Sequence, residues 1–319
     1  MKIIVANLKS NIETITFTGM HNYRNNTNFI LNCKGKVLII TQPIIMGIIN
    51  TTPDSFFERS RKTTITDSID KAAQMIKEGA SIIDIGGQST KPGSDSISAY
   101  EEMERVLPVI TAISQKFPEI IISVDTYYST VAKAAVENGA SIVNDISGGQ
   151  FDSLMMETVA NLNVPYICMH IIGNPKTMQD NPQYENITKE VLDYFIEKIN
   201  TCRQAGIKDV IVDLGFGFGK TIEHNYQLLK SLSLFKMLDC PLLVGISRKG
   251  MIYKPLNIGA EDALNGTTVI NTIALQNGAN ILRVHDVKEA VEAVKLLSLY
   301  REIDATEGNS SRMSFYENR

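Results

Sequence analysis

The stretch IKEGASIIDIGG, residues 76–87, decides the fold because it holds one complete unit of an alternating architecture. A helical pattern ends at Gly79, and a short β-branched run then stops at Asp84. Glycine is the usual residue after a helix C-terminus, and a short apolar run indicates a buried strand. The same order returns in VENGASIVNDIS (136–147) and LQNGANILRVHD (275–286), so a helix followed by a strand is a repeated unit.

Five further apolar runs also stop at polar residues. They are IIMGIIN (44–50), IIISVDT (120–126), PYICMH (165–170), VIVDLG (210–215) and LLVGISRK (242–249). Eight alternating units over about 250 residues predict a (β/α)8 TIM barrel. The alternative is an open parallel sheet, which usually has fewer strands and a glycine fingerprint after the first strand. That position, GIINTTPDSF (47–56), has no such fingerprint, which favours the barrel.

The chain outside the barrel divides into two segments. The run NFILNCKGKVLII (28–40) predicts a β-hairpin that turns at Lys34 and Gly35 and caps the barrel floor. We therefore predict an N-terminal extension (1–42, with the hairpin at about 28–42), a barrel domain (43–300) and a polar C-terminal tail (301–319).

The composition is that of an ordinary globular protein with one sizeable core: 319 residues, 44% hydrophobic, 21% charged and a net charge of −4. Such a mildly acidic chain gives no indication of nucleic-acid binding. The opening MKIIVANLKS is too short an apolar run for a secretory signal, and no run could span a bilayer, so we expect a cytoplasmic location and no membrane partner. The four cysteines lie far apart without a C-x-x-C pair, which predicts reduced thiols rather than a zinc site or disulfides.

Polar residues at the strand ends are the candidates for function. In a (β/α)8 barrel the C-terminal ends of all strands open onto one mouth, where active sites lie. A single polar residue there often only caps the next helix, but eight polar ends together favour a binding site. The residues expected to converge are Asn50, Asp84, Asp125, Asn144, His170, Asp213, Ser247, Lys249, Arg283 and His285.

These side chains divide into two sectors of the mouth. One sector offers acceptors and amides that suit a flat heterocycle with several N–H donors: Asp84, Asp125, Asn144 and Asp213. The last two strands offer Lys249, Arg283 and His285 where barrels commonly bind phosphate, which indicates an anionic group. Period-2 alternation sends Arg248 the other way and predicts a structural pairing for it.

The run DLGFGFGKT (213–221) resembles a nucleotide-binding loop but fits neither common pattern. A P-loop needs a glycine five residues before Gly219, where Leu214 stands, and a dinucleotide fingerprint needs its third glycine at position 220. We interpret the run as a strand that ends in Asp213 and opens into a flexible turn.

Residues at the ends of the first and fifth strands suggest two further roles, metal binding and support of the pocket wall. Asn50, together with Asp54 or Glu58, offers oxygen ligands to a Mg²⁺ ion that also touches a phosphate. Met169 and His170 are expected to line the pocket wall or to support the loop that follows.

The motifs, in this order, resemble those of the dihydropteroate synthase family of pterin-binding barrels. The match runs from about Ile45 to Leu296 through IMGIINTTPDSF, IIDIGGQSTKPG, ISVDT, IVNDISGG, MHIIGNPKTMQ, DLGFGFGKTIEHN, VGISRKG and RVHDVKEA. The resemblance implies a transferase of folate biosynthesis that joins 6-hydroxymethyl-7,8-dihydropterin pyrophosphate to p-aminobenzoate, forming 7,8-dihydropteroate and pyrophosphate. It also implies a Mg²⁺ cofactor, a homodimer and a target of sulfonamides.

Residue roles follow from the resemblance motif by motif. The implied pterin contacts are Asp84, Asp125, Asn144, Asp213, Lys220 and Lys249, with Met169 in the pocket wall. The implied pyrophosphate and Mg²⁺ set is Asn50, Arg283 and His285, which with Lys249 are the expected catalytic residues. The implied p-aminobenzoate pocket is Thr90, Lys91, Pro92, Phe218 and Ser247.

The chain departs from the family pattern at three places, and two alternatives stay open. Gln88 and Lys91 replace the usual Glu and Arg of GGESTRPG, so a point charge stands where a planar fork is usual. Leu214 replaces a proline, and the first loop carries FFERS. The alternatives are a methyltetrahydrofolate-dependent corrinoid methyltransferase, which needs no pyrophosphate site, and a non-catalytic pterin-binding paralogue.

Overall fold

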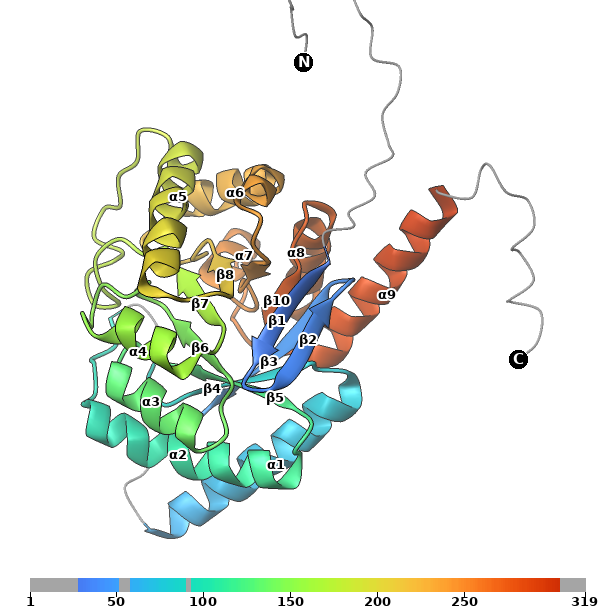
Figure 1. Cartoon of the computed structure of the whole chain (residues 1–319). Coiled ribbons are helices and arrows are strands. Elements are labelled where there is room, and N and C mark those ends of the chain that lie inside the picture. Colours follow the sequence, from blue (N-terminus) through green and yellow to red (C-terminus); the bar gives the residue numbers. More distant parts are fainter. Residues whose placement is uncertain (1–27, 52–57, 90–92, 305–319) are drawn as a thin grey trace, which may run out of the picture.

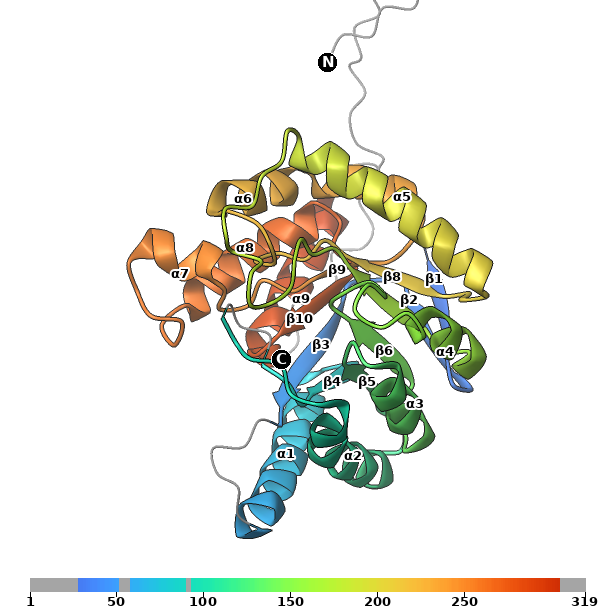
Figure 2. The same cartoon turned by 90° about the vertical axis from the view of Figure 1, so that its left-hand side faces the viewer.

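The computed structural model describes residues 28–51, 58–89 and 93–304. In this part of the chain, parallel strands close into a barrel in the order β10-β3-β4-β5-β6-β7-β8-β9, and helices surround it (Figure 1, Figure 2). The (β/α)8 barrel predicted from the repeated units is therefore confirmed.

The barrel strands are β3 Ile44–Asn50, β4 Ile82–Gly86, β5 Ile121–Asp125, β6 Ile142–Asp145, β7 Tyr166–Met169, β8 Val210–Asp213, β9 Leu242–Val244 and β10 Ile281–Val284. The helices are α1 Glu58–Glu78, α2 Ala99–Lys116, α3 Ser129–Glu137, α4 Met155–Leu162, α5 Ile187–Ala205, α6 Ile222–Ser231, η1 Leu232–Leu238, α7 Gly250–Leu256, α8 Leu264–Gln276 and α9 Val287–Asp304. Among the described residues, no helix has the length and apolar content needed to cross a membrane.

The three repeated segments share one helix-to-strand junction. Gly79, Gly139 and Gly278 follow α1, α3 and α8 with φ angles of 109°, 120° and 105°, which residues with a Cβ rarely adopt. The next residue then bonds back into the helix, as Ala80 N does to Met75 O at 2.9 Å. This junction turns the chain sharply from each helix into the next strand.

The side chains inside the barrel change from apolar in one layer to largely polar in the next. Its floor is built from one inward residue of each strand: Met46, Ile82, Ile121, Ile142, Ile167, Ile211, Leu243 and Ile281. Successive side chains of a strand point to opposite faces, so the residues two positions further along point inward again. We call the polar members of this next level the polar layer, and they are Asp84, Ser123, Asn144, Asp213 and Arg283.

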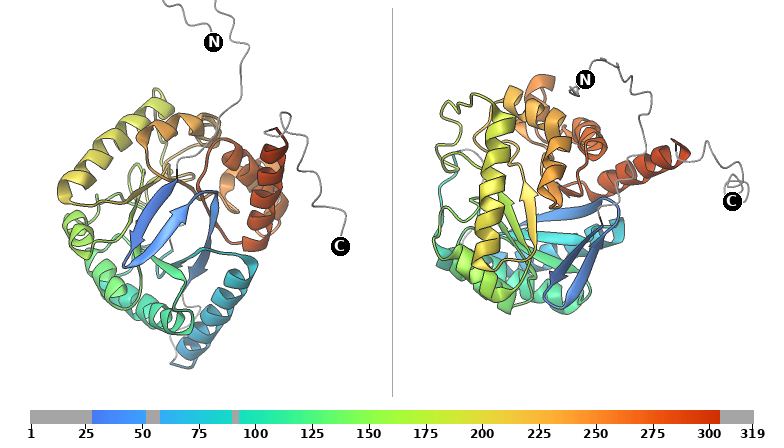
Figure 3. Two further views of the ribbon diagram at one scale, coloured as in Figure 1. Left: turned by 45° about the vertical axis from the view of Figure 1, so that its right-hand side comes forward. Right: turned by 45° about the horizontal axis from the view of Figure 1, so that its top comes forward.

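The N-terminal hairpin closes the floor. Strands β1 (Phe29–Cys33) and β2 (Lys36–Ile40) pair around a turn in which Lys34 and Gly35 have φ angles of 54° and 88°. Its inner face packs on the floor residues through Leu31, Cys33, Leu38 and Ile40. Figure 3 shows the hairpin lying across that end of the barrel, as the sequence predicts.

The predicted start of the tail and the predicted state of the cysteines can be compared with the structure. Arg301, the first residue of the predicted tail, lies in α9, and its Nη2 donates to Leu275 O at 2.8 Å. The four cysteines, all within the described residues, are buried and free.

Candidate active site

An ion-pair network crosses the polar layer. Arg283 on β10 donates from Nε to Asp84 Oδ2 and from Nη2 to Asp125 Oδ2, both at 2.6 Å. Asn144 Nδ2 also donates to Asp84 Oδ2, at 3.1 Å. Side chains from β4, β5, β6 and β10 therefore form one bonded unit, as expected from the convergence of strand ends.

The network leaves one acceptor unused. Asp84 is 0% exposed, and its Oδ1 atom is buried without a hydrogen-bond partner among the described residues. Leaving a buried acceptor unpaired costs about 1 to 3 kcal/mol, more for a charged group. A hydrogen-bond donor brought to this oxygen would remove that cost.

Two more carboxyl groups of the mouth are held in a dry environment. Burial raises the pKa of Asp125, although the guanidinium of Arg283 opposes the shift. Burial also raises the pKa of Asp213 against the opposing charge of Lys249, and Asp213 Oδ1 accepts from Gly215 N at 2.8 Å. Each group gains from a ligand that brings N–H donors.

The sector after β9 and β10 carries the basic groups. Ser247 Oγ lies 3.0 Å from His285 Nδ1 and also accepts from His285 N at 3.2 Å. Burial, with the neighbouring charge of Arg283, lowers the pKa of His285 to about 4, so this imidazole is neutral at pH 7. Arg248 turns away and binds Asp286 through Nε (2.9 Å) and Nη2 (2.8 Å), which confirms its predicted structural pairing.

Lys249 lies between this sector and the glycine-rich turn after β8. Its Nζ donates to Phe216 O at 2.6 Å and lies 4.5 Å from the centre of the Phe218 ring. Burial lowers the pKa of Lys249 to about 8. A lysine and an aromatic ring that the sequence predicts in substrate contacts are thus in direct contact with each other.

Lys220 and Met169 are buried in the wall on the same side. Lys220 is 3% exposed, and its Nζ lies 2.9–3.2 Å from Phe218 O, Gly215 O, His170 Nδ1 and His170 O. Burial lowers its pKa to about 7. Met169 is in an apolar cluster that lines the mouth with Tyr127, Ile146, Ile171, Met178 and Phe218.

Part of the predicted site falls outside the described residues. Thr90, Lys91, Pro92 and Asp54 lie there, and Glu58 opens α1 with a side chain that is not described. Asn50 ends β3 and is exposed. The described residues hold no group of three or more His, Cys, Asp or Glu that could bind a metal. A single amide fits Mg²⁺, which commonly takes few protein ligands and completes its shell with water and phosphate oxygens.

The sequence did not predict the hydrogen bonds of two polar side chains behind the mouth, Gln88 and Glu102. Tyr127 OH donates to Gln88 Oε1 at 3.0 Å, and the same oxygen accepts from Ile97 N at 2.8 Å. Glu102 is fully buried in α2, accepts from Thr126 Oγ1 at 3.0 Å, and has a pKa raised to about 8 by burial. The available signal for Glu102 was its place one helical turn before Val106, on the apolar face of α2.

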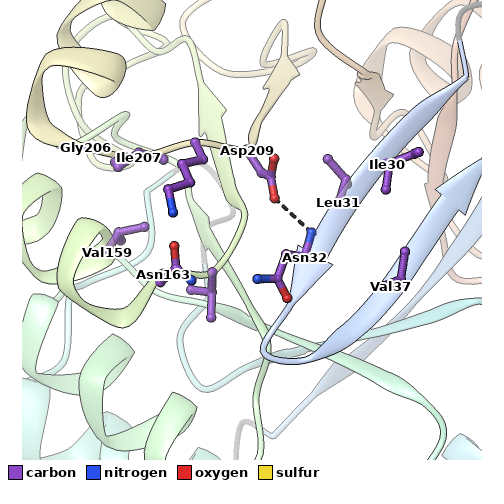
Figure 4. A pocket seen from close by; sticks show the side chains of 11 residues that line it. Ile30, Leu31, Asn32, Val37, Val159, Asn163, Gly206, Ile207 and Asp209 are labelled. Carbon is purple, nitrogen blue, oxygen red and sulfur yellow. Dashed lines mark hydrogen bonds between the residues drawn. The ribbon is translucent and has the colours of Figure 1, made fainter.

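A groove of about 220 Å³ lies at the other end of the barrel, between the hairpin, the end of α4 and the start of β8 (Figure 4). Its lining includes Ile30, Val37 and Val159, and the carboxylate of Asp209 already accepts from Asn32 N at 2.8 Å. It lacks the convergent charged groups of the mouth, so the mouth is the better candidate for chemistry.

Known proteins share this fold and these motifs. A family described as pterin binding enzyme matches residues 46–285. Dihydropteroate synthase of Escherichia coli strain K12 is 45% identical over 269 residues, which are 84% of this chain and 95% of that protein. The Yersinia pestis dihydropteroate synthase, solved with a sulfonamide drug complex, is 39% identical with a TM-score of 0.81, covering 86% of this chain and 100% of that one.

Two solved structures of the Xanthomonas albilineans dihydropteroate synthase are also similar. The structure with 4-aminobenzoic acid is 36% identical with a TM-score of 0.79, and the structure with 7,8-dihydropteroate is 33% identical with a TM-score of 0.76. Each covers 85% of this chain and 98% of its own.

Proposed function

This chain belongs to the dihydropteroate synthases of the pterin binding enzyme family, and on that premise we propose how its barrel mouth works. The substrates are 6-hydroxymethyl-7,8-dihydropterin pyrophosphate and p-aminobenzoate, and the products are 7,8-dihydropteroate and pyrophosphate. The 4-aminobenzoic acid and 7,8-dihydropteroate held by the Xanthomonas albilineans relative support this assignment. We also propose that the chain acts on small molecules, without a nucleic-acid or membrane partner, and that it is cytoplasmic, as expected from the composition.

The observation that carries the proposal is the unpaired Oδ1 of Asp84. A pterin ring presents amino and ring N–H donors along one edge, which match a buried acceptor at the bottom of the mouth. Asp213 supplies a second carboxylate and Asn144 an amide at the same level of the lumen. Desolvation of these groups is offset when the ring donates to them.

The leaving pyrophosphate lies in the basic sector. Its C–O bond breaks with the electron pair moving to the pyrophosphate oxygen, while the electron-rich pterin spreads the positive charge of the CH₂ carbon. The amine nitrogen then forms the C–N bond and loses a proton to solvent. This route needs no side-chain nucleophile.

Arg283 stabilises the charge that grows on the leaving oxygen. Two of its nitrogens bind Asp84 and Asp125, and Nη1 makes no hydrogen bond to a described residue. Fixed positive charge placed where negative charge develops is usually the largest catalytic contribution. His285, neutral and held by Ser247, donates from its Nε2 side. In this tautomer, which is inferred from the contact, Nδ1 of His285 accepts a hydrogen bond from the Ser247 hydroxyl and Nε2 carries the proton.

The aryl amine packs against Phe218, whose ring is held beside Lys249. Thr90, Lys91 and Pro92 complete this pocket by resemblance, with Ser247 at its edge. Asn50, with Asp54 or Glu58 as further candidates, would hold Mg²⁺, which would supply positive charge against that of the pyrophosphate.

Subunit association is proposed to use α8 and α9, which pack against each other. Their outer surfaces expose aliphatic side chains that a monomer would leave in water: Val269, Ile273, Leu296, Leu299 and Ile303. Burial of about 25 cal/mol per Å² of apolar surface favours pairing of this face with a second copy in a homodimer.

Pyrophosphate release tests the activity. Purified protein with both substrates and Mg²⁺ is expected to release pyrophosphate and form dihydropteroate in equal amounts, and to release none when either substrate is omitted. A pterin-binding protein that releases no pyrophosphate under these conditions would be the non-catalytic paralogue. Methyl transfer from methyltetrahydrofolate would support the corrinoid methyltransferase.

A further inference from the structure

The glycine-rich turn between β8 and α6 is held at every carbonyl from residue 215 to residue 219. Phe216 O accepts from Lys249 Nζ at 2.6 Å. Gly217 O accepts from Gln179 Nε2 at 2.7 Å, and Gly219 O from Tyr184 OH at 2.8 Å. The two remaining carbonyls, at positions 215 and 218, both accept from Lys220 Nζ, at 3.0 and 2.9 Å. This turn is therefore clamped by side chains rather than left flexible.

Lys220 is the part of the clamp that lies deepest. It bonds two carbonyls of the turn and also reaches His170 Nδ1 at 3.0 Å and His170 O at 3.2 Å. Its Nζ can donate at most three hydrogen bonds and has four protein partners within reach, so no N–H is left for a ligand. Its side chain is also almost fully buried.

The glycine at position 215 permits this arrangement. Its φ is 68°, and a Cβ added there would clash with the carbonyl oxygen of His170. The backbone of the turn can therefore approach His170 only at a glycine. Lys220 then ties the two segments together, and the side chain at position 218 emerges from the clamped turn beside Lys249.

We propose that Lys220 is a positioning residue: by clamping the carbonyls of Gly215 and Phe218 against His170, it fixes the Phe218 ring in the aryl-amine pocket without touching substrate. This inference rests on the proposed function because it takes Phe218 as part of that pocket. It differs from the role implied by the family resemblance, in which Lys220 serves the pterin.

A double-mutant cycle separates the two roles. Lys220→Met keeps the apolar stem and removes the donors, and we expect the KM for p-aminobenzoate to rise about tenfold, the scale of losing one hydrogen bond to a charged group. The Kd for pterin pyrophosphate, from calorimetry, should stay within about twofold. In a Phe218→Ala background the same substitution should change the KM for p-aminobenzoate by less than about twofold, because coupled residues are not additive. Lys230→Met, an exposed lysine on α6, is the matched control and should change neither constant.

A readout without substrate keeps the inference separate from the proposed function. The chain contains no tryptophan, so Phe218→Trp introduces a single tryptophan, which can be excited at wavelengths that the tyrosines do not absorb. Adding Lys220→Met should make that tryptophan more accessible to acrylamide, whereas Lys230→Met should not. Tyr184→Phe, which releases only the Gly219 carbonyl, provides a milder variant should Lys220→Met not fold, and it should show the same selective rise in the KM for p-aminobenzoate.

Three results would overturn the inference. They are an equal loss of pterin pyrophosphate affinity in Lys220→Met, the same KM factor with and without Phe218, or unchanged quenching of the tryptophan at position 218. If the parent protein releases pyrophosphate and any of these occurs, the inference fails alone. If the parent releases none, the proposed function fails, and the quenching experiment still decides whether Lys220 holds the turn.

Discussion

Arg283 and Asp84 are 199 residues apart in the chain, and Nε of the first lies 2.6 Å from Oδ2 of the second. The bond joins β10 to β4, and β3 lies between these two strands in the barrel. The guanidinium also holds Asp125, so a single side chain fixes two carboxylates and leaves one oxygen of Asp84 unpaired. The group proposed to face the leaving anion and the group proposed to receive the pterin are therefore joined by a direct ion pair.

Asp213→Asn should weaken binding of pterin pyrophosphate. The amide keeps an oxygen for Gly215 N but loses the charge, and a lost charge-assisted hydrogen bond costs about 1.5 to 3 kcal/mol. Calorimetry should show a Kd raised by about tenfold or more. Asp209→Asn, just before the other end of β8, should leave the Kd unchanged. Affinity within twofold of the parent in Asp213→Asn would exclude Asp213 as a pterin ligand.

The hairpin should contribute to stability and not to catalysis. Ile40 is 1% exposed on the barrel floor, and its strand neighbour Ile39 is 55% exposed. Ile40→Ala should lower the free energy of unfolding by about 2 to 5 kcal/mol, and Ile39→Ala by less than about 0.5 kcal/mol. Denaturant unfolding measures both. Equal losses in the two variants would show that the hairpin does not pack on the floor in solution.

Glu102 should make stability depend on pH. Burial raises its pKa from an ordinary 4.5 to about 8, so between these values the folded state binds more protons than the unfolded state. The free energy of unfolding contributed by this group is therefore present below pH 4.5 and is lost as the pH rises through 8. Its Oε1 has no partner among the described residues, which adds to the cost of ionisation.

Glu102→Gln removes that dependence. At pH 8.5 the variant should be more stable than the parent by about 1 kcal/mol or more, because only the parent buries a charge there, and at pH 5 the two should be close. Denaturant unfolding at both pH values measures the difference, and the exposed Glu157→Gln is the control. A parent that is no less stable than Glu102→Gln at pH 8.5 would mean that Glu102 ionises without cost.

Leu296→Glu should convert the proposed dimer to a monomer. Leu296 is 68% exposed on α9, and a charge placed in an apolar contact between subunits opposes association. Light scattering after size exclusion measures the mass. Leu234→Glu, at an exposed position of η1, should remain dimeric. A parent that is monomeric at micromolar concentration would contradict the proposed association.

The sequence predicted what depends on local pattern. The helix-to-strand junction at Gly79 and the alternation that sends Arg283 inward are both set by local pattern, which is readable along the chain. Arg248 lies beyond the end of β9, in a turn where its φ is 55°, so its pairing with Asp286 was predicted correctly although strand alternation does not set its direction. The hairpin was predicted for the same reason, since its turn residues stand between two β-type runs.

Contacts between distant segments were not readable. Nothing near Lys220 indicates that its ammonium meets His170, 50 residues earlier, because that contact depends on how β7 and β8 are set side by side. The pairing of Tyr127 with Gln88 likewise depends on two loops from neighbouring strands. Local pattern gives the direction of a side chain, whereas its partner depends on the register of the barrel.

Steady-state kinetics of Arg283→Met test the central claim, that this guanidinium stabilises the leaving pyrophosphate. Methionine keeps much of the volume and removes the charge, and the loss leaves Asp84 and Asp125 unpaired, so folding is checked first by circular dichroism. Arg301→Met, on the last turn of α9, is the control.

With pterin pyrophosphate saturating and Mg²⁺ present, kcat of Arg283→Met should fall by about 10² or more, the scale of losing one such donor in the transition state. The KM for p-aminobenzoate should change far less, and Arg301→Met should match the parent. An unchanged kcat together with a large rise in the KM for p-aminobenzoate would place Arg283 in the amine pocket and contradict the account.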